Sequence, residues 1–166
     1  REFVPNMQHI MGKDDYPTVK NVIIVGGGKT AVRVVNMLPN GMKAKIFERD
    51  SRRCEELIEL VDTSRVMVIN ADGRSVANLL EENIKSAQAF IALTGNAEAN
   101  ILTCMTAKEL GVRKTIAMIE NMDYVGIAGN ADIGTIINKQ ALTASHIYQL
   151  LLNGDVRNIR NLMTVN

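Results

Sequence analysis

The stretch VGGGKTAV, residues 25–32, contains parts of two different nucleotide-binding loops. Its GKT resembles the end of the P-loop of NTPases, but that motif also requires a glycine at position 23, where the chain has Ile23. The dinucleotide-binding pattern, Gly-x-Gly-x-x-Gly/Ala, is met instead by Gly26, Gly28 and Ala31. An apolar, strand-like run precedes these glycines and a helix-like apolar pattern follows them. The stretch therefore predicts a strand, a phosphate-binding turn and a helix, in that order.

An acidic residue downstream supports this interpretation. Glu48 ends the next strand-like segment, AKIFE, about twenty residues after Gly28, where a carboxylate can accept hydrogen bonds from both ribose hydroxyls. In the predicted turn, Gly26 provides the tight bend, Gly28 admits the pyrophosphate, and Ala31 lets the helix pack closely on the strand. The first N–H groups of the helix would then bind the phosphates.

The composition limits the class of protein. With 166 residues, of which 46% are hydrophobic and 22% charged, the chain is long enough for one compact domain with a core. A net charge of +1 and an aromatic content of 4% argue against a nucleic-acid partner, which usually needs clustered basic and stacking residues. No apolar run approaches the roughly 18 residues of a membrane span, so direct membrane insertion is not expected. Cys54 and Cys104 lack metal-ligand spacing and are expected to be reduced thiols of a cytoplasmic protein.

Six apolar, strand-like runs alternate with helix-like segments along the chain. This alternation predicts an α/β fold, a Rossmann-like, doubly wound, parallel six-stranded sheet with helices on both faces. The predicted strands are residues 21–25, 44–47, 66–69, 89–93, 115–119 and 133–137. Small or polar residues follow the first four strands, at the carboxyl edge where such sheets bind ligands.

Two of the predicted helices have clear ends. Asp50 or Ser51 should cap the helix that runs to residue 60, and Asn96 should open the longest helix, which ends near Gly111. In this longest helix an apolar stripe is expected to face the sheet: Ile101, Leu102, Met105 and Leu110.

The chain divides into three predicted parts. Residues 1–20 have a short amphipathic pattern followed by KDDYPTV, and are expected to be an N-terminal arm and linker. Residues 21–154 form the predicted nucleotide-binding domain. Residues 155–166 alternate like a strand and are expected to be the start of a truncated following segment. The helix predicted over residues 140–152 has apolar residues on more than one side, which predicts that chains self-associate.

Most of the chain resembles the nucleotide-binding half of RCK domains, also called KTN or TrkA-N domains, of potassium channels and transporters. The matching segments, which run from residue 19 to about residue 156, are VIIVGGGKTAVRV, AKIFERDSRRCEEL, VINADG, FIALTGNAEANIL, AKELGVRKTIAMIEN and DIGTIINKQALTASHIYQLLLNGDV. The arm and the NGDV segment are similar to the second RCK half of a duplicated Trk-system regulatory protein. The chain departs from the common pattern at Lys29, Thr30 and Ala31, and in NADG, where GDA is commoner.

The glycine motif, the acidic residue and the resemblance together predict a nucleotide site along the carboxyl edge. The expected ligand is NAD(H), with ATP or ADP as the alternative, because Lys29 beside the phosphates would favour a triphosphate. The predicted binding residues are Gly26, Gly27, Gly28, Lys29, Thr30, Ala31, Glu48, Arg49, Arg53, Ala71, Asp72, Gly73, Thr94, Gly95 and Asn96. No metal site is expected, because the candidate carboxylates do not form a dense cluster; they are Glu98, Glu120 and Asp123.

No catalytic residue is expected at this site, so the protein is predicted not to be an enzyme. His9 and His146 lie in the arm and in a late helix, where we expect a helix-surface or interface role, away from the strand ends. Tyr16 and Lys20 match the Tyr-x-x-x-Lys spacing of short-chain dehydrogenases. Pro17 follows the tyrosine, however, and the pair precedes the first strand, so the helix that aligns such a pair is not expected.

The resemblance implies a regulatory role. We expect a ligand-sensing subunit domain that binds NAD(H), assembles as a homodimer or a higher ring, and gates a membrane-embedded potassium transporter. Such a domain would be cytoplasmic and peripheral to the inner face of the plasma membrane. Two alternatives from other classes stay open: a fragment of an NAD-dependent oxidoreductase, and an assembly module that has lost ligand binding.

Overall fold

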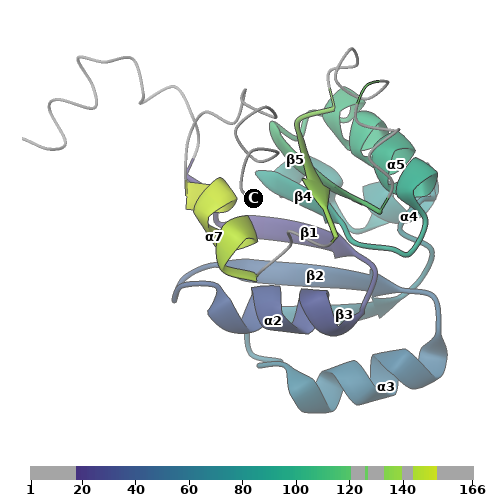
Figure 1. The fold of residues 1–166 in the computed structure, drawn as a ribbon. Helices are drawn as coiled ribbons and strands as arrows, with labels where there is room; N and C mark the ends of the chain where they lie inside the picture. The colour runs from purple at the N-terminus through teal and green to yellow at the C-terminus, as the bar shows by residue number, and fades with distance from the viewer. Residues whose placement is uncertain (1–17, 121–125, 127–132, 140–143, 153–166) are drawn as a thin grey trace, which may run out of the picture.

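The computed structural model describes residues 18–120, 126, 133–139 and 144–152. Within these residues the chain forms one sheet of six parallel strands in the order β3-β2-β1-β4-β5-β6 (Figure 1). The strands are β1 (Asn21–Val25), β2 (Lys43–Glu48), β3 (Val66–Asn70), β4 (Ala89–Ala92), β5 (Lys114–Ile119) and β6 (Thr135–Asn138). The helices are α2 (Lys29–Met37), α3 (Ser51–Leu60), α4 (Val76–Glu81), the 3-10 turn η2 (Ile84–Ser86), α5 (Ala97–Glu109) and α7 (Ala144–Leu152).

Helices cover both faces of the sheet (Figure 1). On one face α2 packs beside α7, and α3 packs on β2 and β3. On the other face lie α4 and α5, with α5 against β4 and β5. This arrangement confirms the predicted fold class, and each predicted strand is present with ends that differ by no more than two residues.

The strand order changes direction between β3 and β4. The chain adds β2 and β3 on one side of β1, then returns to add β4, β5 and β6 on the other side. Val25 at the end of β1 is therefore paired with Phe47 of β2 on one side and Ala92 of β4 on the other. The carboxyl ends of β1 and β4 lie side by side at this switch point, where open α/β sheets bind ligands.

Two apolar layers hold the central strands in place. The layer under α2 and α7 includes Ile24 and Ile91, and the layer under α4 and α5 includes Phe90; each of these side chains is 0% exposed. All four residues of β4 are buried, as expected for a parallel strand covered on both faces. Burying one such large side chain stabilises a fold by about 1.5–3 kcal/mol. The strands that end at the carboxyl edge are therefore firmly held by the core.

The predicted sheet-facing stripe of α5 is wrong in part. Leu102 and Met105 are 63% and 39% exposed, whereas Ile101 and Leu110 are partly buried against the core. The buried face instead consists of smaller residues at helical spacing, which are Asn100, Thr103, Cys104 and Ala107. Short side chains allow α5 to lie close to β4 and β5. Two of the four are polar, so a pattern of large apolar residues does not predict this face.

The late helix α7 packs mainly within its own chain. Ile147, Leu150 and Leu151 are buried in the layer shared with α2, while Leu152 is 52% exposed. Much of the apolar surface that suggested self-association is thus covered inside the chain, and the oligomeric state stays a prediction. The arm, His9, Asp123, the side chain of His146 and the segment after Gly154 lie outside the described residues. Within the part of the chain that is described, no helix is both long and apolar enough to cross a bilayer.

Both cysteines are free and buried. Cys104 is 0% exposed, its Sγ donates to the carbonyl of Ile116 at 3.4 Å, and burial raises its pKa to about 12. Burial, and next the charge of Glu48, raise the pKa of Cys54. The thiolate is the reactive form of cysteine, so neither side chain is suited to nucleophilic or redox chemistry in the folded chain.

We therefore predict that neither thiol reacts with an aromatic disulfide reagent in the native protein at pH 8, and that both react at once in concentrated urea. The raised pKa values and the burial both suppress the thiolate in the fold and are lost on unfolding. Absorbance of the released thiol measures this. Rapid native labelling of either cysteine would contradict the structure.

Candidate functional site

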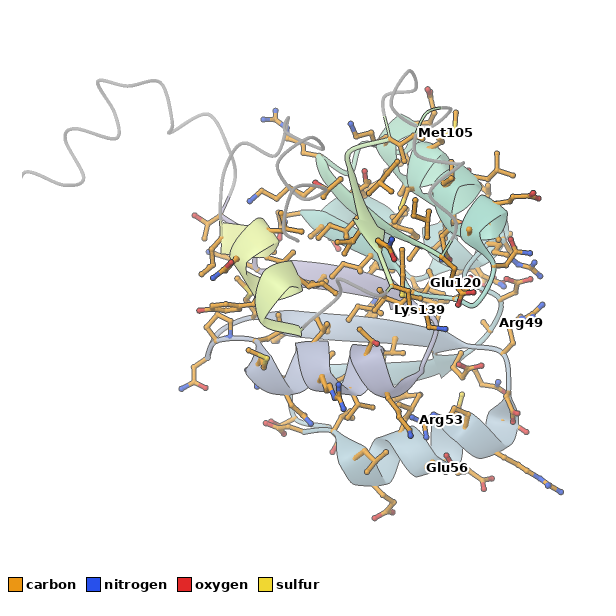
Figure 2. All side chains as sticks on the ribbon, in the orientation of Figure 1. Arg49, Arg53, Glu56, Met105, Glu120 and Lys139 are labelled. Carbon is orange, nitrogen blue, oxygen red and sulfur yellow. The ribbon has the colours of Figure 1, made fainter. Side chains whose placement is uncertain are left out.

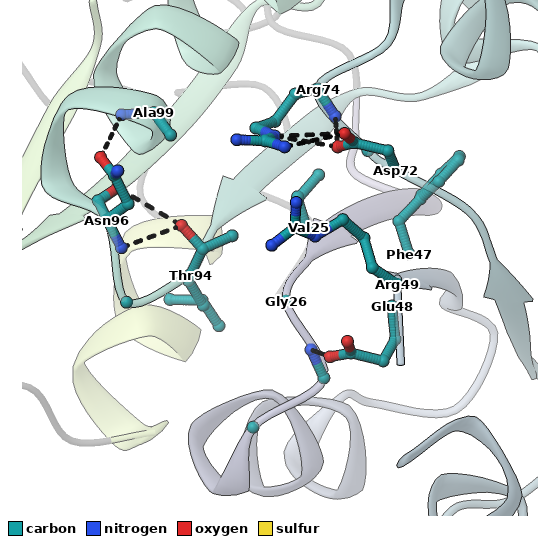
Figure 3. Close-up of a pocket in the computed structure, with 15 residues that line it drawn as sticks. Val25, Gly26, Phe47, Glu48, Arg49, Asp72, Arg74, Thr94, Asn96 and Ala99 are labelled. Carbon is teal, nitrogen blue, oxygen red and sulfur yellow. Dashed lines mark hydrogen bonds and ion pairs between the residues drawn. The ribbon is translucent and has the colours of Figure 1, made fainter. Parts of the chain in front are cut away.

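A pocket of about 460 Å³ opens at the carboxyl edge, where the ends of β1 and β4 lie side by side (Figure 3). The turn after β1, the end of β2, the loop after β3 and the loop after β4 contribute its walls. The N-termini of α2 and α5 follow two of these loops. The first N–H groups of a helix have no carbonyl partner within the helix, and its N-terminus carries a partial positive charge, so the pocket is suited to an anionic ligand.

The turn after β1 has the geometry that the glycine motif predicts. Gly26 has φ of +102°, and a Cβ at this position would lie 2.9 Å from the carbonyl carbon and oxygen of Leu93. Only glycine fits there. Gly28 precedes α2 in an extended conformation, and no side chain caps the helix. Apart from its chain neighbours, no atom lies within 4 Å of where a Cβ on Gly28 would be. The first turn of α2 is therefore open to a ligand.

Glu48, at the end of β2, binds the turn from the side. Its Oε2 accepts a hydrogen bond from the N–H of Gly27 at 2.8 Å (Figure 3). Its Oε1 accepts one from the N–H of Asp50 at 2.9 Å. Each carboxylate oxygen has a further lone pair, and Glu48 lines the pocket, so it can also accept from a ligand hydroxyl. The side chain thus joins two loops and can still bind a hydroxyl group of a ligand.

Asp72 and Arg74, in the loop after β3, form an ion pair at another wall of the pocket. The guanidinium of Arg74 donates to Asp72 through Nε at 3.0 Å and through Nη2 at 2.9 Å (Figure 3). These hydrogen bonds hold the pKa of Asp72 below its usual value, so its carboxylate stays charged near neutral pH. Arg49, which is exposed, also lines the pocket. The site therefore presents two carboxylates and two guanidinium groups.

A buried asparagine fixes the loop after β4. Asn100, which is 1% exposed, accepts from the N–H of Thr94 at 3.1 Å and from its hydroxyl at 2.5 Å. The Asn100 amide donates to the carbonyls of Thr94 and Met118 at 2.9 and 2.7 Å. Asn96 then caps α5 by accepting from the N–H of Ala99 at 2.9 Å. The loop is thus tied both to its own helix and to the end of β5.

The structure brings most of the predicted binding residues to the pocket. Ten of them line it: Gly26, Gly27, Gly28, Glu48, Arg49, Asp72, Gly73, Thr94, Gly95 and Asn96. Five do not: Lys29, Thr30, Ala31, Arg53 and Ala71. Ala31 is buried beneath the loop, as its predicted packing role requires, whereas Lys29 is exposed.

Several residues of the site were not predicted from the sequence. The structure adds lining residues from strand ends and loops, which are Val25, Phe47, Arg74, Leu93 and Ala99, and it adds Asn100 as a support. Arg74 had a usable signal, because it follows Asp72 and Gly73 in the loop after β3. Asn100 had a weaker one, since an asparagine inside a helix usually needs a specific hydrogen-bond partner.

Of the three candidate carboxylates for a metal, Glu98 and Glu120 lie in the described part of the chain and Asp123 does not. Among the described residues no group of three or more His, Cys, Asp or Glu side chains is placed to hold an ion. Glu120 pairs with Lys139 at 2.5 Å, at the ends of β5 and β6 (Figure 2). Glu98 lies in the first turn of α5.

The chain is similar to proteins of a known family. The model of the TrkA-N domain family matches residues 22–139. The Trk system potassium uptake proteins TrkA of Haemophilus influenzae and Halomonas elongata are each 34% identical over 143 residues, which cover 86% of this chain and 31% of the relative. A TrkA homolog of Methanothermobacter thermautotrophicus is 29% identical over 139 residues, covering 83% of this chain and 63% of that protein. The chain thus spans about a third of the length of the first two relatives.

Solved structures show the same fold. The TrkA-N domain of the inner membrane protein ybaL from Escherichia coli superimposes with a TM-score of 0.63 at 16% identity, covering 80% of this chain and 97% of that one. The Bordetella bronchiseptica enzyme WbmG, solved in complex with NAD, gives a TM-score of 0.50 at 16% identity, with 66% and 40% covered. At these identities the likeness concerns the fold alone.

We predict that Asn100→Ala lowers the free energy of unfolding by about 2–4 kcal/mol, because Thr94 and Met118 lose buried hydrogen-bond partners. Urea denaturation followed by circular dichroism measures the loss. The matched control is Asn36→Ala, since Asn36 is exposed on α2 and makes one long hydrogen bond of 3.4 Å to Leu60. A loss no larger than that of the control would remove Asn100 from the support of the loop.

Proposed function

This chain belongs to the TrkA-N family, and we propose that it is a regulatory, ligand-sensing domain of a potassium uptake system. In this proposal it binds NAD(H) at the pocket on the carboxyl edge and thereby gates a membrane potassium transporter. The observation that carries the proposal is the position of Glu48. Its carboxylate stands beside an open glycine turn and a helix N-terminus, the combination that dinucleotide-binding folds use for ribose and phosphate.

The contacts of the pocket support NAD(H) over the alternatives. Glu48 would accept from the adenosine ribose, and a 2′-phosphate at that place would face its negative charge, which disfavours NADP(H). Lys29 is the feature that would favour ATP, but it is exposed and does not line the pocket. ATP or ADP remains the alternative ligand, because both share the adenosine half of NAD.

The ionisable groups of the pocket support binding more than catalysis. Within the described residues they are Glu48, Arg49, Asp72 and Arg74. Arg74 neutralises Asp72, and the two oxygens of Glu48 already hold backbone N–H groups. Such groups position ribose and phosphate well, whereas hydride-transfer enzymes need a group for proton transfer beside the substrate. These features favour a sensor over an oxidoreductase fragment.

The proposed partners follow from the relatives. The matched proteins are named as Trk system potassium uptake proteins. We therefore propose a cytoplasmic domain, peripheral to the inner face of the plasma membrane, that works as a homodimer or a higher ring with a membrane-embedded transporter subunit. Occupancy of the pocket would reach the transporter through the interfaces between subunits.

We predict that Gly28→Val abolishes binding of NADH while the fold is kept. A valine side chain would occupy the open space before α2 where the phosphates are proposed to lie, and its Cβ would have no atom within 4 Å apart from its chain neighbours. Calorimetry measures binding. The thermal midpoint of unfolding should fall by no more than a few degrees, which corresponds to a loss of about 1 kcal/mol in the free energy of unfolding. Arg33→Val, at an exposed position of α2 outside the pocket, is the control.

Undiminished binding by Gly28→Val would place the phosphates elsewhere and refute this site. The gating half of the proposal is tested separately. Cells that carry Gly28→Val in the full-length protein should take up potassium at a rate that no longer responds to the NADH level. A normal response in those cells would contradict gating through this pocket.

We also predict that NADH binds at least about tenfold more tightly than NADPH. Glu48→Gln should weaken NADH and ADP alike, by roughly 1.5–3 kcal/mol, because both present the same ribose to a charged acceptor. The same variant should reduce the difference in affinity between NADH and NADPH. The control is Glu55→Gln, on the exposed side of α3. Equal affinities of the native chain for NADH and NADPH would contradict the role given to Glu48.

A further inference from the structure

Arg53 contacts the glycine turn without lining the pocket. It lies on α3, and its Nε donates to the carbonyl of Gly27 at 2.7 Å. Its Nη1 donates to Glu56 at 2.6 Å, one turn further along the same helix, which holds the guanidinium in place (Figure 2). The side chain is only 26% exposed, so the bond to Gly27 is partly shielded from water. A charged donor in such a place makes a strong hydrogen bond.

Gly27 is consequently held from both ends. Glu48 accepts from its N–H at 2.8 Å, and Arg53 donates to its carbonyl. The residue also presses against α3, because a Cβ at this position would lie 2.5 Å from Cδ1 of Leu57. Three glycines in succession allow many backbone conformations, so a loop of this composition needs such contacts to keep one of them.

The bond to the Gly27 carbonyl also decides where the next N–H points. The described chain has no cis peptide bond, and in a planar trans peptide the C=O of one residue and the N–H of the next point in opposite directions. Because Arg53 holds the Gly27 carbonyl toward α3, the N–H of Gly28 is turned away from α3. Gly27 and Gly28 line the pocket and no residue of α3 does, which agrees with an N–H of Gly28 that faces the pocket.

We propose that Arg53 is a positioning residue for phosphate binding: it fixes the Gly27–Gly28 peptide so that the N–H of Gly28 is presented to the phosphates of the nucleotide. The inference rests on the proposed function, because it assumes a phosphate-bearing ligand in this pocket. It changes the role predicted for Arg53 from the sequence, which was direct contact with the cofactor. Arg53 acts instead through the backbone of the turn.

The test compares two ligands that differ only in phosphate. Calorimetry, with competition for the weaker ligand, measures ADP and adenosine binding to the native chain and to Arg53→Met, which keeps the apolar stem and removes the donor. ADP should bind about tenfold more weakly to the variant, as expected for one charge-assisted hydrogen bond, while adenosine should change less than about twofold. Arg53→Lys, which can still donate to the Gly27 carbonyl, should recover part of the ADP affinity.

Arg52→Met is the matched control. Arg52 is the neighbouring arginine on α3, is exposed and does not line the pocket, so its loss should leave both affinities unchanged. Thermal midpoints of all variants show whether each folds. Equal weakening of ADP and adenosine by Arg53→Met, or no weakening of ADP, would overturn the positioning role. If the native chain binds neither ADP nor NADH, the proposed function itself fails and the inference fails with it.

Discussion

The close approach of Gly26 to the end of β4 is the constraint on which the site depends. A Cβ at Gly26 would lie only 2.9 Å from the Leu93 carbonyl, so the turn after β1 lies directly against the end of the neighbouring strand. This contact is possible because β1 and β4 are adjacent at the point where the strand order reverses. The chain leaves β1 and β4 in diverging directions there, and the pocket forms between the two loops. Without a glycine at this position the two loops could not share one wall.

The loops around the pocket are held by polar side chains that act on backbone groups. Glu48 and Arg53 hold the two ends of Gly27, and Asn100 holds the loop after β4. Each donor or acceptor comes from a helix or strand anchored in the apolar core. Backbone N–H groups at the starts of α2 and α5 are thereby kept in fixed directions, and an anion that binds them meets a site that needs little rearrangement.

The sequence predicted the fold and much of the pocket because these depend on local patterns. Apolar runs define the six strands, and Gly26, Gly28 and Glu48 stand at spacings set by the turn and by the length of one β-α-β unit. The sheet-facing side of α5 was predicted wrongly in part, because small and polar residues such as Asn100 and Ala107 form it. The role of Arg53 could not be read from spacing either. It depends on how α3 lies against the turn, which is a tertiary contact between residues far apart in the sequence.

The proposed nucleotide site spans the carboxyl edge at the switch point. Backbone amide NMR of the chain during a titration with NADH would locate the bound nucleotide, since the amides of each loop give separate signals. We expect the largest chemical-shift changes on the amides of residues 26–29 and 94–97 and on those next to Glu48 and Asp72. Amides at the amino edge of the sheet should stay unchanged. Shifts centred on the amino edge, or no shifts at millimolar NADH, would contradict this site.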